Sequence, residues 1–137
     1  MKQQARGQVG MALTDYEAAS IKDPTNKYAY YDIGVIYQQR GDGTDAESAY
    51  HRALLADPGY RPALFNLAIL LTSADPNQAI GLYRQLLQIN TNDANVNFNL
   101  GLLLISQNQP VEGHADLQKA LRLDPTLRSR VPPGITP

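Results

Sequence analysis

Three Asp-Pro pairs recur along this chain at a nearly constant spacing, and this spacing restricts the possible folds more than any other feature of the sequence. Their prolines are Pro24, Pro58 and Pro125, so the first two lie 34 residues apart and the last lies 67 residues further on, one short of two such periods. The 137 residues hold four periods of this length. A fixed period in this range is typical of an array of similar units, each of which packs on its neighbours.

Each period contains two stretches whose apolar residues recur at the spacing of a helix face. Signals for helix starts lie between the stretches. Pro76 and Pro110 suit a first helical turn, where no N–H is needed, and Thr44 to Glu47 have the pattern of a capping box. The Asp-Pro pairs of Pro24, Pro58 and Pro125 end the second stretches, because a residue before proline is pushed out of the α region. No alternating strand pattern competes, so we predict an all-α chain.

The alignment also predicts the boundaries of the repeats. The middle repeat is one residue short, and we place the missing residue in its SADPNQ turn, where a deletion rotates no helical face. We expect residues 1–130 to form the array and residues 131–137 to form an extended tail. Within the array we expect a partial repeat at 7–26 and full repeats at 27–60, 61–93 and 94–127.

Large and small residues follow a fixed order in each repeat. In the first full repeat they are Tyr30, Ile33, Gly34, Tyr37, Ala46, Tyr50, Ala53 and Pro58. This order resembles the tetratricopeptide signature, W-x₂-L-G-x₂-Y, then A-x₃-F, then P. The later repeats match it with Leu64, Leu67, Ala68, Leu71, Ala79 and Tyr83, and with Leu100, Gly101, Leu104, Leu117, Ala120 and Pro125. Thr91, Asn97 and Gly113 depart from the pattern.

The resemblance covers residues 7–125 and begins with Ala12, Tyr16, Ala19 and Pro24, which look like a second helix. It implies a right-handed α-α superhelix, a solenoid of helix-turn-helix repeats, whose concave surface is lined by the first helix of each repeat. The family uses this surface as a peptide-binding groove. The residues expected to line it here are Tyr31, Asp32, Val35, Gln38, Phe65, Asn66, Ile69, Thr72, Phe98, Asn99, Leu102 and Ile105.

Two of these groove positions repeat in chemical character. The first of them gives an aromatic series of Tyr31, Phe65 and Phe98, and the next gives a polar series that ends in two asparagines, Asn66 and Asn99. An asparagine amide offers a donor and an acceptor, so it can pair with one peptide unit of an extended ligand. The series is similar to the asparagine ladder in the tetratricopeptide region of O-GlcNAc transferases. The alternative interpretation is that these asparagines only solvate the groove.

The charge distribution excludes several ligand classes. The formal net charge is −1 and no run of Lys or Arg occurs, which argues against nucleic acid and against direct membrane binding. A carboxylate clamp of the kind found in chaperone-tail cochaperones is also excluded, because Tyr31, Val35, Asn95 and Asn99 occupy the positions of its cations. An apolar or backbone-recognised protein segment fits better.

The sequence contains no convincing catalytic or metal-binding motif. His51 and His114 lie on second helices and lack the further ligands that zinc needs. The carboxylates of Asp42, Asp45 and Glu47 lack the alternation of a calcium loop and are explained by helix capping. The chain has no cysteine and no phosphate-cradling glycine loop. We therefore expect no enzymatic activity, no cofactor and no metal.

The two ends of the array are expected to expose apolar surface, for example at Met11, Leu13 and Tyr16. The chain then either comes from a longer protein or associates through its ends as a homo-oligomer. The VPPGITP tail has the composition of an extended segment. We hypothesise that it occupies a groove, its own or that of a neighbour. The sequence favours a cytoplasmic origin and leaves open a soluble domain of an anchored protein.

The leading functional hypothesis is a protein-protein interaction module that binds an extended peptide or partner segment in its concave groove. One alternative is a structural or self-assembly repeat domain without a dedicated ligand. Another is the recruiting domain of a larger enzyme such as a glycosyltransferase.

Overall fold

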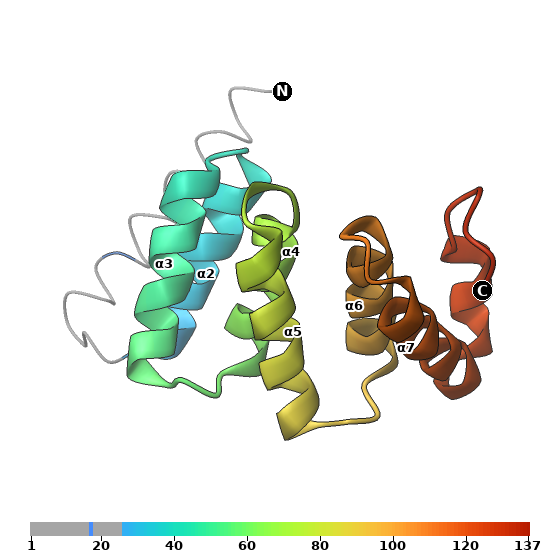
Figure 1. Cartoon of the computed structure of the whole chain (residues 1–137). Coiled ribbons are helices and arrows are strands. Elements are labelled where there is room, and N and C mark those ends of the chain that lie inside the picture. The colour runs from blue at the N-terminus through green and yellow to red at the C-terminus, as the bar shows by residue number, and fades with distance from the viewer. Residues whose placement is uncertain (1–16, 18–25) are drawn as a thin grey trace. The chain divides into compact units, whose positions relative to one another are not determined.

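The computed structural model describes residue 17 and residues 26–137 (Figure 1). The partial repeat expected at 7–26, including Met11, Leu13 and Tyr16, lies outside the described residues except for its positions 17 and 26. Every element in the described part is helical, which confirms the all-α prediction. The elements are α2 (Lys27–Gln39), α3 (Gly43–Ala56), α4 (Arg61–Ala74), α5 (Pro76–Ile89), α6 (Ala94–Ser106), α7 (Pro110–Leu123) and the 3₁₀ helix η1 (Pro125–Arg130).

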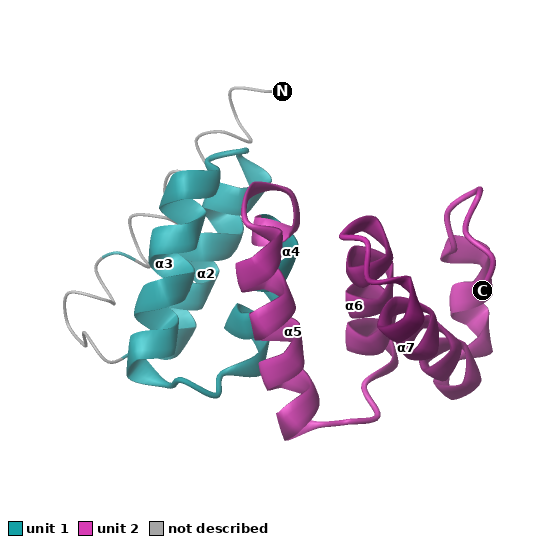
Figure 2. Cartoon of the chain, viewed as in Figure 1, with its two compact units in different colours: residues 1–70 teal, residues 71–137 magenta. Residues whose placement is uncertain are grey.

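The chain divides into two compact units, residues 1–70 and residues 71–137, which are coloured separately in Figure 2. The division falls inside α4. Unit 1 therefore contains α2, α3 and most of α4, and unit 2 contains the end of α4 together with α5, α6, α7 and η1. Each unit contains a complete helix pair, α2 with α3 in unit 1 and α6 with α7 in unit 2.

The turn between α2 and α3 reverses the chain within three residues. Gly41 has a φ of +80°, its N–H donates to the Gln38 carbonyl at 3.1 Å, and the Asp42 N–H donates to the Tyr37 carbonyl at 2.9 Å. These two bonds satisfy carbonyls that the end of α2 leaves unpaired, and a residue without a Cβ enters this left-handed region at no steric cost. Asp42 is at once the last residue of this turn and the N-cap of α3.

The start of α3 corrects one prediction. The capping box of Thr44 and Glu47 does not form, because α3 begins one residue before Thr44 and its N-cap is Asp42, which makes no side-chain capping hydrogen bond. The turn at Gly41 ends at Asp42, and the position of this turn therefore determines where the helix starts. Asp45 lies in the first turn of α3, where the positive end of the helix dipole stabilises its carboxylate.

Small residues allow each first helix to lie close to its second helix. In unit 1, a Cβ added at Gly34 would lie 2.5 Å from the Tyr50 ring. In unit 2, a Cβ at Gly101 would lie 2.8 Å from the Gly113 carbonyl oxygen, and one at Gly113 would lie 2.7 Å from the Gly101 carbonyl oxygen. Gly113, which departs from the signature, therefore complements Gly101, and the two backbones meet directly.

The connection within the middle repeat is two residues shorter than that in the last repeat, while α4 is one residue longer than α6, so the middle repeat is one residue short overall. Asp75 alone separates α4 from α5, and its side chain accepts from the Gln78 N–H at 3.2 Å. Three residues separate α6 from α7, and Asn108 takes the left-handed position there with a φ of 61°. Pro76 and Pro110 both lie in the first turns of their helices, as predicted.

Two of the predicted helix ends at Asp-Pro pairs are confirmed, and the third, at Asp23-Pro24, lies outside the described residues. Asp57 is the C-cap of α3 and Asp124 is the C-cap of α7, each in extended conformation before its proline. The departure at Asn97 is also explained, because its side chain is 1% exposed and donates to the carbonyls of Thr91 and Asp93 at 3.1 and 2.9 Å. The described residues contain no helix with the length and apolar character needed to cross a membrane.

Candidate peptide-binding surface

The twelve residues predicted to line a groove all lie on the first helices α2, α4 and α6. Eleven of them are at least partly exposed, and Ile69 is 42% exposed. Phe98 is the exception among the twelve, since it is only 3% exposed. Most of the predicted positions are therefore accessible to a ligand within their own units.

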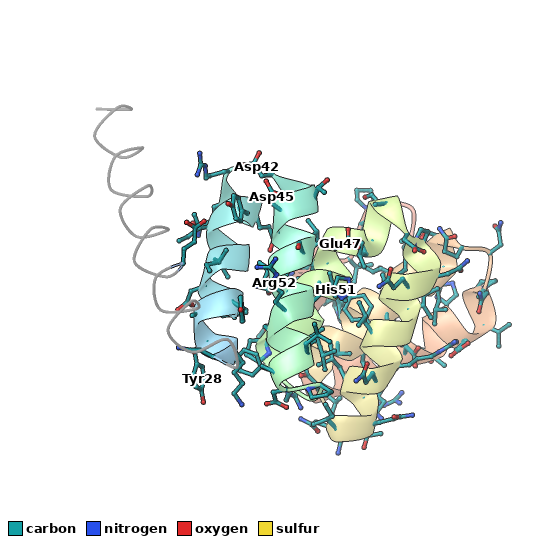
Figure 3. All side chains as sticks on the ribbon, turned by 90° about the vertical axis from the view of Figure 1, so that its left-hand side faces the viewer. Tyr28, Asp42, Asp45, Glu47, His51 and Arg52 are labelled. Atoms are coloured by element: carbon teal, nitrogen blue, oxygen red, sulfur yellow. The ribbon has the colours of Figure 1, made fainter. Side chains whose placement is uncertain are left out.

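Unit 1 carries a cluster of tyrosines around the start of α2. The Tyr60 ring makes edge-to-face contacts with Tyr28 and with Tyr31, each at 5.7 Å between centroids. The Tyr31 ring also contacts the Tyr50 ring at 6.0 Å. Tyr28 is 62% exposed, and Figure 3 shows it at the end of the α2–α3 pair that lies opposite Asp42. We call Tyr28, Tyr31 and Tyr60 the tyrosine cluster.

Lys27 and Asp57 form an ion pair beside the tyrosine cluster. The Lys27 ammonium lies 2.6 Å from Asp57 Oδ2, 4.9 Å from the Tyr60 ring centroid and 5.3 Å from the Tyr28 ring centroid. The hydrogen bond with Asp57 raises the pKa of Lys27, and the same bond lowers the pKa of Asp57. Because the cation is already paired, it provides no isolated charge for an acidic ligand.

Asn66 is engaged by tyrosine hydroxyls in unit 1. Its Nδ2 donates to the Tyr31 hydroxyl at 3.2 Å and to the Tyr50 hydroxyl at 3.4 Å. The Tyr50 hydroxyl in turn donates to Gln38 Oε1 at 2.5 Å. Burial raises the pKa of Tyr50, and the hydrogen bond with Asn66 opposes that rise. The asparagine thus links its own helix α4 to both helices of the preceding repeat.

Unit 2 repeats this arrangement around Tyr83 of α5. Burial raises the pKa of Tyr83, while hydrogen bonds with the side chains of Thr72 and Asn99 oppose the rise. In both units a buried second-helix tyrosine meets a polar residue near the end of its own first helix and an asparagine on the next first helix. The arrangement ends in the last repeat, where Leu117 and Ile105 replace the tyrosine and its first partner.

The Phe98 side chain is buried among residues of α7 and η1 in unit 2. It belongs to a buried cluster with Leu117, Ala120, Leu121 and Leu127, and the Arg130 guanidinium lies 5.5 Å from its ring centroid. Leu102 and Ile105, two further predicted groove residues, pack against the same cluster together with Val131 and Ile135 of the tail. The tail therefore packs against a cluster that includes Phe98 and that otherwise consists of residues of α7 and η1.

Sequence reasoning did not select Tyr28 or Tyr60 as site residues. Both lie just outside the signature positions, one near the first residue of α2 and one directly before α4. The available signal was composition, since the chain has eight tyrosines against two phenylalanines. Tyrosine is favoured at interfaces because its ring is buried while its hydroxyl keeps a hydrogen-bond partner.

The described residues hold no group of three or more His, Asp or Glu side chains suited to a metal ion. His51 Nε2 lies 3.6 Å from Glu47 Oε1 on the same helix, and both side chains are labelled on α3 in Figure 3. Asp42 and Asp45 lie at the start of that helix. The expectation that these residues form no metal site stays a prediction for the chain as a whole.

Comparison with known proteins identifies the repeats. A tetratricopeptide repeat model matches residues 3–61 and 31–94, and a second tetratricopeptide repeat model matches residues 94–127. The computed structure resembles a tetratricopeptide repeat protein from Parabacteroides merdae, with a TM-score of 0.81, 25% identity and coverage of 88% of this chain and 49% of that one. It also resembles MamA from Desulfovibrio magneticus RS-1, with a TM-score of 0.79, 22% identity and coverage of 90% and 71%.

The sequence relatives of this chain include two longer proteins. The probable UDP-N-acetylglucosamine–peptide N-acetylglucosaminyltransferase SPINDLY of Hordeum vulgare is 36% identical over 108 residues, which is 73% of this chain and 11% of that protein. The photosystem I assembly protein Ycf3 of Acaryochloris marina is 35% identical over 74 residues, which is 52% of this chain and 45% of that protein. This chain therefore spans a minor part of each of these relatives.

The match to SPINDLY confirms the resemblance to the tetratricopeptide region of O-GlcNAc transferases that the asparagine series indicated. The matched solved structures confirm the fold as a helical solenoid of helix-turn-helix repeats. The matched models extend over most of the sequence. The chain belongs to the tetratricopeptide repeat family, whose repeats are protein-interaction modules.

Proposed function

We propose that this chain binds an extended segment of a partner protein along the exposed sides of its first helices. The observation that carries this proposal is the tyrosine cluster of unit 1, in which three rings gather at the start of α2 and Tyr28 stays 62% exposed. A solvent-exposed ring that is already held by its neighbours binds a partner at a small cost in conformational entropy.

The chemistry of the surface favours an uncharged segment. Lys27, a cation beside the tyrosine cluster, is paired with Asp57, so an acidic ligand gains little there. The rings contact one another edge to face, and their exposed apolar surfaces suit packing by proline or aliphatic side chains. Accessible hydroxyls and amides, such as those of Tyr31 and Gln38, provide hydrogen bonds to a ligand backbone.

The asparagine series has two roles in this proposal. Asn66 and Asn99 hold neighbouring helices together through tyrosine hydroxyls, and we propose that their accessible sides also contact the ligand backbone. Neither role requires a catalytic group, so we propose that the chain itself is not an enzyme. We further propose that it binds neither nucleic acid nor membranes, in keeping with its net charge of −1.

A second candidate function is supported by the match to the SPINDLY protein. In this version the chain is the recruiting part of a larger glycosyltransferase and binds the protein that is to be modified. The first-helix surface would be used in the same way under both versions. They differ in whether a catalytic domain shares the polypeptide.

A selection from a library of uncharged twelve-residue peptides, displayed against the immobilised chain, tests the proposed function. We expect binders rich in proline and aliphatic residues that lose at least tenfold in affinity when Tyr28→Ala and Tyr31→Ala are introduced together. Leu55→Ala is the matched control, because Leu55 is 84% exposed on the second helix α3. The proposal would be contradicted if the selected peptides had the same affinity for the double tyrosine variant as for the wild-type chain.

A further inference from the structure

The Lys27 ammonium lies in the corner between two rings of the tyrosine cluster. It is 5.3 Å from the Tyr28 ring centroid and 4.9 Å from the Tyr60 ring centroid. The planes of the two rings stand at 88° to each other, so the rings form two walls beside the ammonium. The negative face of an aromatic ring attracts a cation at these distances. The corner is therefore a place for a cation, and a residue of the chain itself occupies it.

A carboxylate completes this corner and is held in place by its own turn. Asp57 Oδ2 lies 2.6 Å from the Lys27 ammonium, and Asp57 Oδ1 accepts from the Gly59 N–H at 3.2 Å. The Asp57 carbonyl accepts from the Tyr60 N–H at 3.1 Å. The turn from Asp57 to Tyr60 thus holds the carboxylate and the ring near each other without help from Lys27.

The rings of the cluster also contact one another independently of Lys27. The Tyr60 ring meets Tyr31 edge to face at 83°, and it meets Tyr28 in the same manner. Aromatic walls and a carboxylate are the groups by which proteins recognise a positively charged side chain or a quaternary ammonium ion. With the Lys27 side chain removed, this part of unit 1 has the composition of a cation-binding site.

A second carboxylate, that of Asp32, acts on the cluster at a different group. Burial raises the pKa of Tyr60, and the charge of Asp32 adds to this rise. The pKa of Lys27, in contrast, is raised mainly by its hydrogen bond with Asp57. Asp57 is therefore the counter-ion of the ammonium, and Asp32 acts on the Tyr60 hydroxyl.

We infer that Lys27 is the residue that restricts the tyrosine cluster to uncharged ligands, because its ammonium takes the place that a cationic group of a ligand would occupy. A cationic side chain of a partner meets ring faces and a carboxylate that are already in use, and the like charge of Lys27 repels it. An uncharged segment meets no such penalty. The inference rests on the proposed function in that the cluster binds a protein segment, and it adds which segments the cluster rejects.

The first test measures cation binding directly and needs no partner protein. Tetramethylammonium is added to the isotopically labelled full chain while the ring NMR signals of Tyr28 and Tyr60 are followed, and uncharged tert-butanol is the matched ligand of similar shape. Lys27→Ala vacates the corner at the first residue of α2, where alanine suits the helix. We expect this variant to bind tetramethylammonium about fivefold more tightly than the wild-type chain. Lys27→Arg keeps a cation in the corner and should bind it as weakly as the wild-type chain.

Two further variants identify the counter-ion. In the Lys27→Ala background, Asp57→Asn should remove the gain in affinity for tetramethylammonium, whereas Asp32→Asn should retain it. The inference is overturned if the wild-type chain and Lys27→Ala bind the cation equally or not at all, if tert-butanol shows the same gain, or if Asp57→Asn leaves the gain intact. Should Lys27→Ala lose helix content by circular dichroism, Lys27→Gln decides in its place, since it removes the charge and keeps the stem of the side chain.

The second test applies the same variant to the ligands of the proposed function. In an uncharged peptide that the wild-type chain binds, each aliphatic residue is replaced in turn by arginine. We expect one position at which this change weakens binding to the wild-type chain about tenfold and binding to Lys27→Ala about threefold or less. The absence of such a position would overturn the inference. If no uncharged peptide binds the wild-type chain, the proposed function fails, and the tetramethylammonium result still decides the inference.

Discussion

At the scale of single residues, the hydroxyls of Tyr50 and Tyr83 explain why polar side chains recur on the first helices. The family signature has phenylalanine at this position of the second helix, and a buried tyrosine there needs a hydrogen-bond partner for its hydroxyl. Gln38 and Asn66 provide the partners for Tyr50, and Thr72 and Asn99 provide those for Tyr83. The last repeat has a leucine, Leu117, in place of the tyrosine and so needs no such partners.

The link between Tyr83 and Asn99 is testable by a double-mutant cycle. We expect Asn99→Ala to lower the free energy of unfolding by about 1–2 kcal/mol, because the buried hydroxyl loses a partner. Tyr83→Phe should cost about 1 kcal/mol, and the double variant should cost about 1 kcal/mol less than both single changes combined. Urea unfolding followed by circular dichroism gives these values.

Asn95→Ala is the control for this cycle, since Asn95 is exposed on the same helix. It should change the free energy of unfolding by less than about 0.5 kcal/mol. Strict additivity of Tyr83→Phe and Asn99→Ala would show that the two side chains do not interact in solution.

The contact between Gly101 and Gly113 gives a second prediction at this scale. Gly101→Ala should destabilise the chain by about 2–3 kcal/mol, because the added Cβ would lie 2.8 Å from both the Gly113 carbonyl oxygen and the Leu117 nitrogen. Gly81→Ala is the matched change in an exposed helix position with nothing within 4 Å, and it should stabilise by about 0.5–1 kcal/mol. Thermal unfolding curves of the two variants should shift in opposite directions, and a shift in the same direction would contradict this account.

At the scale of elements, the Lys27–Asp57 pair joins the first residue of α2 to the C-cap of α3. Because the pKa of Asp57 is lowered in the folded chain, its contribution to stability is present above the unfolded value and is lost as the pH falls through the folded value. Because the pKa of Lys27 is raised, its contribution is present below the unfolded value and is lost as the pH rises through the folded value.

Asp57→Asn should therefore lower the urea midpoint at neutral pH relative to wild type. The difference between the two proteins should shrink below the ordinary pKa of aspartate as the wild-type carboxylate is protonated. Because the pair is partly exposed, the effect should also weaken as salt is added. A difference that is constant from neutral pH down to strongly acidic pH would show that the carboxylate charge plays no part.

The elements also show how far the sequence predicts the structure. Pro76 and Pro110 predicted helix starts correctly, and the Asp-Pro pairs of Pro58 and Pro125 predicted helix ends correctly, because proline restricts the backbone by covalent geometry wherever it occurs. The capping box at Thr44 was wrong, because the start of α3 depends on the left-handed turn at Gly41 in the preceding helix end. A local pattern is reliable only when no neighbouring turn fixes the same residues.

The candidate site was less predictable than the fold. The signature positions predicted which residues lie on the first helices, but Phe98 is buried in a cluster with residues of α7 and η1 and lies under Arg130, which follows the last repeat. Tyr28 and Tyr60 were missed because they are neighbours in space and lie 32 residues apart in the sequence. Contacts of this kind lie outside any pattern confined to one repeat.

At the scale of the whole molecule, the chain is a set of similar helix pairs in which each unit presents different chemistry. Unit 1 presents the tyrosine cluster, and unit 2 presents an aliphatic surface on which the tail, residues 131–137, is docked.

The most direct measurement of the central claim is an NMR titration of the isotopically labelled full chain with a peptide obtained from the uncharged library. We predict that shift changes concentrate on first-helix residues, above all on Tyr28, Tyr31 and Phe65, and that the outward residues of the second helices, such as Leu55 and Val111, stay unchanged. Shift changes confined to the second helices, with the first helices unaffected at saturation, would contradict the claim that the first helices form the binding surface.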